Sequence, residues 1–377
     1  MPTGLDPTQE TERETKRGGI LILWTVLVFA AVFCFSLCLR TSRTGFVHPA
    51  EALLNLYTWM KYHLTKALDL PGYLEAEQAI RNGLPLYFET IRRFTISVLT
   101  FLAGGMLAVA GAVYQGAFRN PIAAPTVLGV AGGVNLGFLL TVLIYGGAAY
   151  GEILARYRFC YFFALLMLAI VLAAGKMISG LRNRPSLADM LLVGVALSSI
   201  VGVIESYVVY EMEAETLRML TELRSGMYIN TDAISFLFIG AAFLIGFTPI
   251  FLLRNSFNAI CFSDDEAYAM GVNPALVRYS SLVFASLLMV SAMVHVGSVG
   301  MISLIVPHIC RYFVGVNFKR LLWGCFVYGG LLLLICRAIS ALISFGLYGE
   351  APITTVVSIL AAPVFVIVVL QQRRGWE

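Results

Sequence analysis

The chain has 377 residues, of which 59% are hydrophobic and only 13% are charged, and its net charge at pH 7 is +4. Soluble domains carry roughly 25% charged residues, and a chain with a mean hydropathy of +0.83 would expose apolar patches that aggregate in water. This composition excludes an ordinary soluble protein, and the absence of a basic stripe argues against nucleic-acid binding. Lipid is the expected solvent.

Ten apolar segments are long enough to cross a membrane as helices, which need about 20 residues each. They cover residues 20–39, 94–114, 126–146, 159–179, 189–210, 233–253, 279–297, 299–315, 321–346 and 352–371. Barrel strands would be about half as long and would alternate in polarity, which these segments do not. We expect an all-α, polytopic membrane protein with about ten transmembrane helices.

The first apolar segment is predicted to be a retained helix that follows a cytoplasmic tail, residues 1–19. Its apolar run is too long for a signal peptide, and no A-x-A cleavage site follows it. Lysines and arginines gather in alternate loops, so the positive-inside rule favours both termini in the cytoplasm. No linker-like segment interrupts the chain, and 20–377 is expected to form a single transmembrane domain.

Two segments outside the apolar runs are expected to be external and helical. The segment 41–92 breaks the charge trend, and its stretch HPAEALLNLYTWMKYHLTKAL has apolar residues at helical spacing, with Pro71-Gly72 as the expected end. The segment 211–224 is a second, charged candidate. Each is expected to be a surface helix or part of a docking platform.

Motifs for covalent chemistry are missing from the sequence. It contains no H-E-x-x-H and no G-x-S-x-G, and its one Gly-Lys pair is followed by Met177 rather than by Ser or Thr. Seven cysteines without a C-x-x-C and four dispersed histidines give no metal site. We therefore expect no enzyme, no metal and no cofactor bound by this chain.

Charges inside the apolar segments are rare, which matters because one charge at mid-bilayer costs about 2.5–3.5 kcal/mol. Glu205 and Arg337 are the two that stand out. They either neutralise each other or face a water-filled path, and the sequence leaves both alternatives open. Tyr207, with Tyr210 and Met212, would suit a flat ring system, although such a stripe is more often packing.

The loop SDDEAYAMGVNPALVRYS, 263–280, holds more signals than a connector needs. Ser263 is a good N-cap, and the acidic run 264–266 complements the positive start of a helix. Gly271 is expected to end that helix, and Asn273-Pro274 to begin another. Two short helices would make a rigid elbow that a partner can push; the alternative is an ordinary interfacial turn.

Five stretches together resemble the FecCD-type permeases, which are membrane subunits of ATP-binding-cassette (ABC) importers for ferric siderophores, haem and cobalamin. GAFRNPIAAPTVLGVAGG is similar to the family's loop between its second and third helices, and MLLVGVALSS to the start of its fifth helix. DDEAYAMGVNPALVR resembles the coupling helices that dock into an ATPase. VGSVGMISLIVPHICRYFVG and GEAPITTVVSILAAPVFVIVVLQQRR resemble later segments, so the likeness spans about 93–374 in the family's order.

The resemblance implies a BtuC-like permease architecture in the cytoplasmic membrane of a prokaryote. Its partners would be an ABC ATPase dimer that holds ATP and Mg, a second permease copy and an external substrate-binding protein. The gate at the cytoplasmic mouth would comprise Asn120, Pro121, Ile122, Leu187 and Ala188. The contacts that couple the chain to the ATPase, at 263–278, would involve Asp264, Asp265, Glu266, Ala267, Met270 and Gly271. Because prolines restrict backbone angles, the gate loop is expected to be stiff.

Two departures from the family pattern concern docking of the binding protein. Family members often carry L-R-x-P-R before the second helix, whereas this chain has Arg92-Arg93-Phe94-Thr95, in which only Arg93 fits. The arginine that usually precedes E-L-P is also missing, and Arg337 lies too early to replace it. The docking candidates are therefore Arg92, Arg93 and Glu350, with 41–92 and 211–224 as replacement surfaces.

A second class of function stays open at this point. An ion-coupled secondary carrier would use an intramembrane acid, and Glu205 is the candidate, with Tyr207 and Arg337 as further residues of the pathway. A membrane-embedded enzyme is the third class, but no convergent acid, base or nucleophile supports it. The predicted function is an importer permease for an iron chelate, haem or corrinoid, driven by a separate ATPase.

Overall fold

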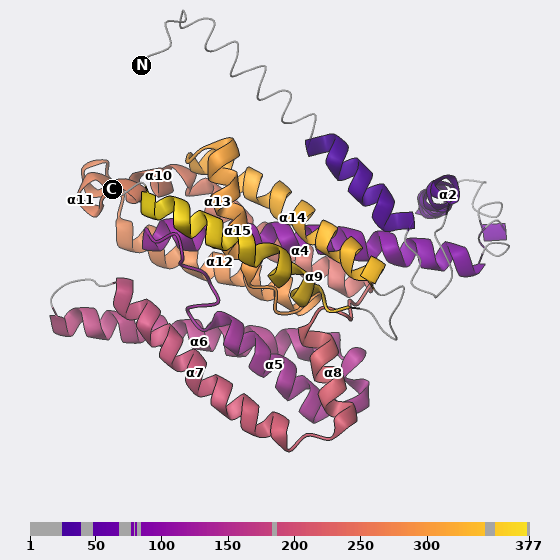
Figure 1. The fold of residues 1–377 in the computed structure, drawn as a ribbon, viewed down its shortest axis with the longest axis horizontal. Coiled ribbons are helices and arrows are strands. Elements are labelled where there is room, and N and C mark those ends of the chain that lie inside the picture. Colours follow the sequence, from indigo (N-terminus) through magenta and orange to yellow (C-terminus); the bar gives the residue numbers. More distant parts are fainter. Residues whose placement is uncertain are drawn as a thin grey trace, which may run out of the picture. The chain divides into compact units, whose positions relative to one another are not determined.

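The computed structural model describes residues 25–38, 48–67, 77–78, 80, 84–182, 187–343 and 351–374. The elements of this described part are helices (Figure 1). The chain divides into two compact units, Met1–Ser97 and Val98–Glu377, and α4 (Leu84–Phe118) begins in the first and continues in the second. The helix predicted within 41–92 is present as α2 (Pro49–Ala67), while its expected end at Pro71-Gly72 lies outside the described residues.

The first unit packs its helices through a small apolar cluster. Leu37, from the helix Thr25–Cys38, and Ala52 of α2 are buried, with Phe33, Leu56 and Phe94 around them. Two buried hydroxyls, Ser36 Oγ and Ser97 Oγ, lie 2.7 Å apart and share a hydrogen bond. The first apolar segment therefore packs along the start of α4.

The second unit contains the remaining apolar helices in the predicted order. They are α5 (Val130–Tyr145), α6 (Ile153–Arg182), α7 (Leu187–Tyr210), α9 (Ala233–Leu252), α12 (Pro274–Val296), α13 (Met301–Val314), α14 (Phe318–Ile343) and α15 (Ile353–Arg374). Short elements connect them: η1 (Gly146–Tyr150), α8 (Ala214–Arg224), α10 (Arg254–Phe262) and α11 (Asp264–Ala269). Seven described helices are long and apolar enough to span a membrane, and Thr25–Cys38, Met301–Val314 and Ile353–Val366 are shorter apolar helices. The prediction of about ten apolar helices is confirmed.

Helix α4 begins ten residues before the predicted apolar segment. The predicted start at residue 94 marked where the charged residues end, but the helix itself extends back to Leu84. Glu89 and Arg93 support this extension, because Arg93 Nε donates to Glu89 Oε1 over 2.9 Å at helical i,i+4 spacing. An apolar run marks the part of a helix that lies within the membrane. The helix itself can continue beyond that run through charged residues.

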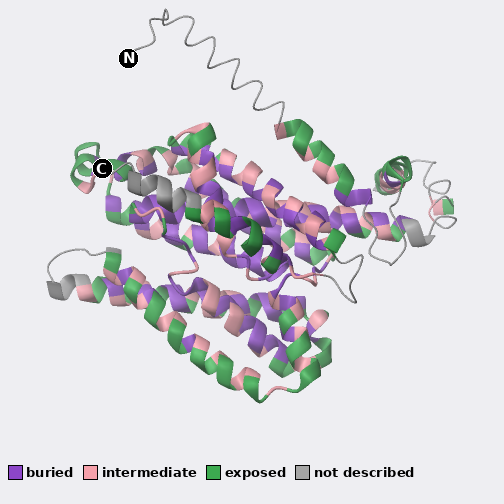
Figure 2. Cartoon of the chain, in the orientation of Figure 1, coloured by how far each residue is buried: buried purple, intermediate pink, exposed green. Residues whose placement is uncertain are grey.

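The core of the second unit forms where glycines of α4 meet α13 and α14. Carbon atoms added at Gly104 and Gly111 would lie 2.5 Å from Gly329 O and 1.8 Å from Ser303 O. Backbones this close leave no room for side chains, so the small residues set the interhelical distance. Figure 2 shows the resulting buried centre along α4 and α12.

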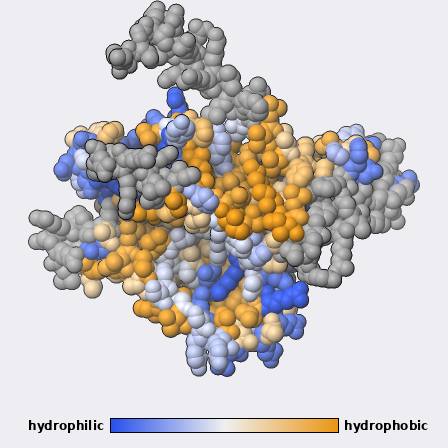
Figure 3. Space-filling view, in the orientation of Figure 1, coloured by the Kyte–Doolittle hydropathy of each residue, from blue (hydrophilic) through white to orange (hydrophobic). Residues whose placement is uncertain are grey.

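Helix α7 is the least buried of the long helices. Only 11% of its most apolar stretch is buried, against 78% for α4. Its exposed apolar side chains include Leu192, Val203 and Ile204. Figure 2 shows exposed residues recurring along α7. The space-filling view likewise shows broad apolar areas on the surface (Figure 3). These surfaces require lipid or another protein chain as their neighbour.

Two ends of the second unit are used as reference points below. One end carries α10, α11 and the chain that leaves α4, and is called the elbow end (Figure 1). The opposite end carries α8 and is called the α8 end. Helix α7 runs from the elbow end to the α8 end.

The close approach of α4 and α13 predicts the behaviour of two alanine variants. In a helix, Gly→Ala normally stabilises by about 1 kcal/mol. Gly111→Ala should instead destabilise by about 3 kcal/mol or more, because Ser303 O blocks the new carbon and the two backbones must separate. The measurement is the melting temperature and the yield of monodisperse protein in detergent.

Gly240→Ala is the matched control, because a carbon atom added there in α9 meets nothing within 4 Å. It should keep or raise the melting temperature. Equal stability of the two variants would contradict the packing of α4 described above.

Candidate functional site

The loop 119–129 leaves α4 through a tight C-terminal cap. Asn120 N donates to Gln115 O over 3.1 Å and Arg119 N to Gly116 O over 3.2 Å, which is the paired-bond pattern that commonly ends helices. The residue in left-handed conformation at this position is usually glycine, but here it is Arg119, with φ +48°. An L-residue in this region costs about 1–2 kcal/mol, so the chain retains an arginine where glycine would be easier.

The predicted gate residues form a compact turn directly after this cap. Asn120 Oδ1 accepts a hydrogen bond from Ile122 N over 3.0 Å, and Asn120 O accepts one from Ala123 N over 3.0 Å. Pro121 lies between them and is half-buried. Ile122 is 53% exposed at the tip. The expected stiffness has a local cause in these bonds and in the fixed φ of proline.

Helix α13 holds this turn from one side. His308 Nε2 donates to Pro121 O over 2.9 Å. Gln115, in the last turns of α4, donates from Nε2 to Leu304 O over 3.0 Å and accepts from Arg311 Nη1 over 2.5 Å. The end of α4 and the turn after it are therefore anchored to the same helix.

Helix α7 approaches the second half of the loop closely. A carbon atom added at Gly194 would lie 2.6 Å from Val127 O. Gly129, at φ +82°, starts α5 next to Gly194 and Ser198. The loop 119–129 thus runs between α13 and α7, and a displacement of the loop would press on α7.

The turns of the elbow 263–274 are capped as its sequence predicts. Ser263 Oγ caps α11 by accepting from Glu266 N over 3.0 Å. Gly271, at φ +75°, follows the helix end, and Asn273 Oδ1 caps α12 by accepting from Leu276 N over 3.2 Å. Pro274 is the first residue of α12. Both turns of the elbow are fixed by capping bonds, but only α11 is a short helix. The helix that begins at Pro274 is α12, which has 23 residues and includes nearly all of the predicted apolar segment 279–297, so the expectation of two short helices is wrong.

The surface of α11 divides into a buried side and an exposed side. Ala267 is fully buried, whereas Tyr268 and Met270 are 59% and 58% exposed. Asp265, Glu266 and Gly271 are also exposed. Of the six predicted coupling residues, Ala267 is therefore directed into the protein. Four others are exposed: Asp265, Glu266, Met270 and Gly271.

Asp264 is the sixth, and it differs from the neighbouring acids. Its Oδ1 pairs with Arg119 Nη2, and it accepts a second bond from Arg278 Nη2 over 3.0 Å. Burial alone would raise the pKa of Asp264, but the bond and charge of Arg278, joined by those of Arg119, outweigh it and hold the pKa below its usual value. Asp264 is therefore ionised at neutral pH, and the pairing is lost only as the pH falls through that lowered pKa.

Both arginines also bond the backbone. Arg119 Nε donates to Ile260 O over 2.6 Å, and Arg278 Nε donates to Ala117 O over 2.7 Å. Arg278 is 6% exposed, so its guanidinium depends on these acceptors. The sequence analysis did not identify this pairing, because no local pattern connects positions so far apart in the chain.

The α8 end contains the intramembrane acid. Glu205 Oε1 lies 3.2 Å from Arg224 Nη2, and Arg224 Nη2 also donates to Asn135 O over 2.8 Å. Arg337 Nη1 donates to Gly226 O over 3.0 Å. Glu205 is therefore paired with Arg224 and not with Arg337, so of the two alternatives the mutual pair is wrong.

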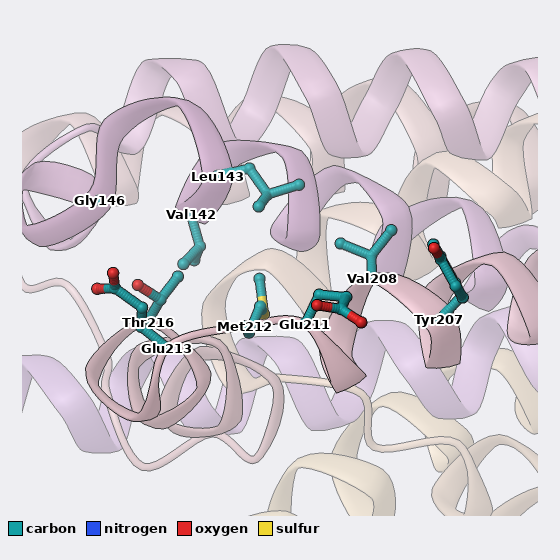
Figure 4. A pocket seen from close by; sticks show the side chains of 9 residues that line it. All are labelled: Val142, Leu143, Gly146, Tyr207, Val208, Glu211, Met212, Glu213 and Thr216. Atoms are coloured by element: carbon teal, nitrogen blue, oxygen red, sulfur yellow. The ribbon is translucent and has the colours of Figure 1, made fainter.

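A pocket of about 420 Å³ opens beside the end of α7 (Figure 4). Its walls come from α5 and η1, from the end of α7 and from the start of α8. The lining residues are Val142, Leu143, Gly146, Tyr207, Val208, Glu211, Met212, Glu213 and Thr216. Tyr207, a predicted residue of the pathway, is 72% exposed here. The pocket combines apolar walls with two carboxylates.

The remaining predicted residues are not brought together at one place. Leu187 begins α7, with its side chain outside the described residues, and Ala188 is exposed. Arg92 is exposed, Arg93 is 9% exposed and bonded to Glu89, and Glu350 lies outside the described residues. Among the described residues, no group of three or more His, Cys, Asp or Glu is placed to hold a metal ion.

Comparison with known proteins relates this geometry to a family. Residues 76–371 match the model of the FecCD transport family. The chain is 30% identical to the "Probable iron chelatin transport system permease protein" of Helicobacter pylori (strain ATCC 700392 / 26695) over 281 residues, 73% of this chain and 80% of that protein. It is 31% identical to the vitamin B12 import system permease protein BtuC of Citrobacter koseri over 285 residues, 74% and 81% of the two chains.

A solved structure agrees with the fold. It is an inward-facing conformation of a protein assigned to the metal-chelate type of ABC transporter, and it covers 94% of this chain and 99% of its own. The TM-score is 0.72 at 22% sequence identity, so the likeness concerns the fold. The match of the family model over most of the chain identifies this protein as a member of the FecCD transport family, a membrane permease of ABC importer type.

Proposed function

We propose that this chain forms the transmembrane path of an importer for a metal chelate, haem or corrinoid, and that a separate ABC ATPase drives it. The observation that carries the proposal is the capped elbow 263–274, which is rigid, exposed on one side and bonded on its other side to the loop that ends α4. A connector between two helices needs none of these features. A site that receives force from a partner needs all three.

The ATPase would grip the exposed side of the elbow. Asp265, Glu266, Tyr268, Met270 and Gly271 are available there. ATP and Mg would be held by the ATPase alone, because this chain has no phosphate-binding loop. The chain would do no covalent chemistry; it would interconvert two conformations whose relative populations ATP changes.

The gate would lie at the elbow end. Asn120, Pro121 and Ile122 would close the path there, with Leu187 and Ala188 at the start of α7. The basic residues near this end, which include Arg119, Arg254 and Arg278, favour its placement on the cytoplasmic side of the inner membrane. Both termini would then be cytoplasmic and α8 external.

The exposed face of α7 would line the path together with a second permease copy. Such a face is apolar from Leu192 to Tyr207 and carries little charge, which suits a large ligand of low polarity. The two relatives named above are described as permeases for iron chelatin and for vitamin B12. An external binding protein would deliver the ligand to the α8 end, where Tyr207 and the pocket beside it lie.

The proposal predicts ATP hydrolysis by a complex reconstituted in lipid. This chain, purified with its candidate ATPase, should hydrolyse ATP faster when its binding protein carries the transported ligand. Haem, a ferric siderophore and cobalamin are tested in turn, and one of them should stimulate hydrolysis and accumulate in vesicles. If no ATPase binds the chain and uptake follows an ion gradient instead, the proposal is wrong.

The second candidate, an ion-coupled carrier, predicts a different result for Glu205→Gln. In a carrier this change would abolish ion dependence. In an importer it removes one partner of the Glu205–Arg224 pair, so we expect ATP-driven uptake to persist while stability falls by about 1–3 kcal/mol. Thermal unfolding and uptake with and without an ion gradient measure the two effects. Glu152→Gln, at an exposed acid, is the matched control for stability.

A further inference from the structure

One carboxylate connects three segments at the elbow end. Asp264 is the first residue of α11, and its Oδ1 receives Arg119 and Arg278. Arg119 is the first residue after α4, and Arg278 belongs to α12. Through Arg278 Nε, the bonding continues to Ala117 O, inside the last turn of α4. The elbow, α12 and the end of α4 therefore meet at a single carboxylate oxygen, Asp264 Oδ1.

The contrast within α11 shows that this connection is specific to one acid. Asp264, Asp265 and Glu266 are consecutive, but the two that follow Asp264 are exposed and bind neither arginine. Asp264 and the fully buried Ala267 are three positions apart and share one side of the helix. Asp264 directs its Oδ1 from that side to both arginines, although 38% of its side chain is exposed.

The backbone at Arg119 supports the same conclusion independently. Arg119 occupies the left-handed position of the cap, at φ +48°, where glycine would carry no steric cost. An outlier of this kind persists where surrounding contacts require it. The contacts that require it here are those of its side chain, with Asp264 and with Ile260 O.

We propose that Asp264 is a positioning residue that transmits movement of the elbow to the gate loop 119–122 through Arg119, rather than a contact for the ATPase. The inference rests on the proposed function and assigns this one acid a different role within it. When the ATPase displaces α11, the ion pair carries Arg119 along, and Arg119 lies directly before Asn120 in the chain. Arg278 holds the end of α4 next to the elbow, because it bonds both Ala117 O and Asp264 Oδ1.

Loss of the ion pair between Arg119 and Asp264 should separate ATP hydrolysis from transport. Without it the elbow still moves with the ATPase, but the loop 119–122, which His308 holds at Pro121, no longer follows. The expected signature is a fall in the amount of ligand transported per ATP hydrolysed, with hydrolysis itself retained. A residue with only a structural role would lower both rates together and leave this ratio unchanged.

The experiment uses the complete importer in vesicles and measures uptake and ATP hydrolysis in the same sample. Asp264→Asn and Arg119→Gly should each lower the transport-to-hydrolysis ratio at least fivefold, with hydrolysis within about twofold of wild type. The double variant should lower the transport-to-hydrolysis ratio no further than either single variant, because each single change already breaks the Arg119–Asp264 ion pair on which the ratio depends. Arg119→Gly guards against misfolding, since glycine suits the backbone at this position.

Asp265→Asn is the matched control, because it removes the same charge from the same turn without touching either arginine. It should change uptake and hydrolysis in parallel, with the ratio unchanged.

If Asp264→Asn instead weakens co-purification of the ATPase and keeps the ratio, Asp264 is a docking contact and the inference is overturned. A wild-type ratio in both Asp264→Asn and Arg119→Gly overturns it as well, while the importer itself stands. Failure of the wild-type complex to couple ATP to uptake would instead refute the proposed function.

Discussion

The close contact of α4 with α13 and α14 is the constraint on which the second unit depends. In lipid, apolar side chains gain little by meeting one another, so helices associate through fitted backbones and through polar bonds between them. Gly104 and Gly111 let α4 touch Gly329 and Ser303 backbone to backbone. Polar bonds then join α4 to two helices, to α12 from Tyr114 Oη to Ser286 Oγ and to α13 from Gln115 Nε2 to Leu304 O. The residue at which α4 ends therefore sets the position of the loop 119–129 at the elbow end.

The two ends of the second unit differ in the groups that join their segments. At the elbow end, Arg119 and Arg278 share one carboxylate and also bond backbone carbonyls, so the ion pairs join separate segments. At the α8 end, backbone carbonyls of the stretch 224–226 join separate segments. Arg224 O accepts from Ser298 N over 2.8 Å, and Gly226 O accepts from Arg337 Nη1 over 3.0 Å. The α8 end thus joins its segments through main-chain carbonyls together with the Glu205–Arg224 pair, whereas at the elbow end one carboxylate receives two arginines from different segments.

Local signals in the sequence were sufficient for some features and not for others. The apolar helices and the caps at Ser263, Gly271 and Asn273 were predicted, because run length and capping chemistry are local. The extension of α4 to Leu84 was missed because charged residues end an apolar run without ending a helix. The partner of Glu205 was missed because pairing across distant positions has no local pattern. The orientation of Asp264 did have a signal: it lies three positions before Ala267, one of the two alanines of α11.

The central position of α4 also has a consequence for how the protein is made. Gln115 and Leu304, which bond across α4 and α13, are 189 positions apart in the chain. At a synthesis rate of about 5–20 residues per second, α4 emerges about 10–40 s before its partner does. During that interval its glycine-rich face has only lipid or the insertion machinery beside it. Biogenesis therefore includes a period in which the central helix of the second unit has been made but α13 and α14, which pack against its glycines, have not.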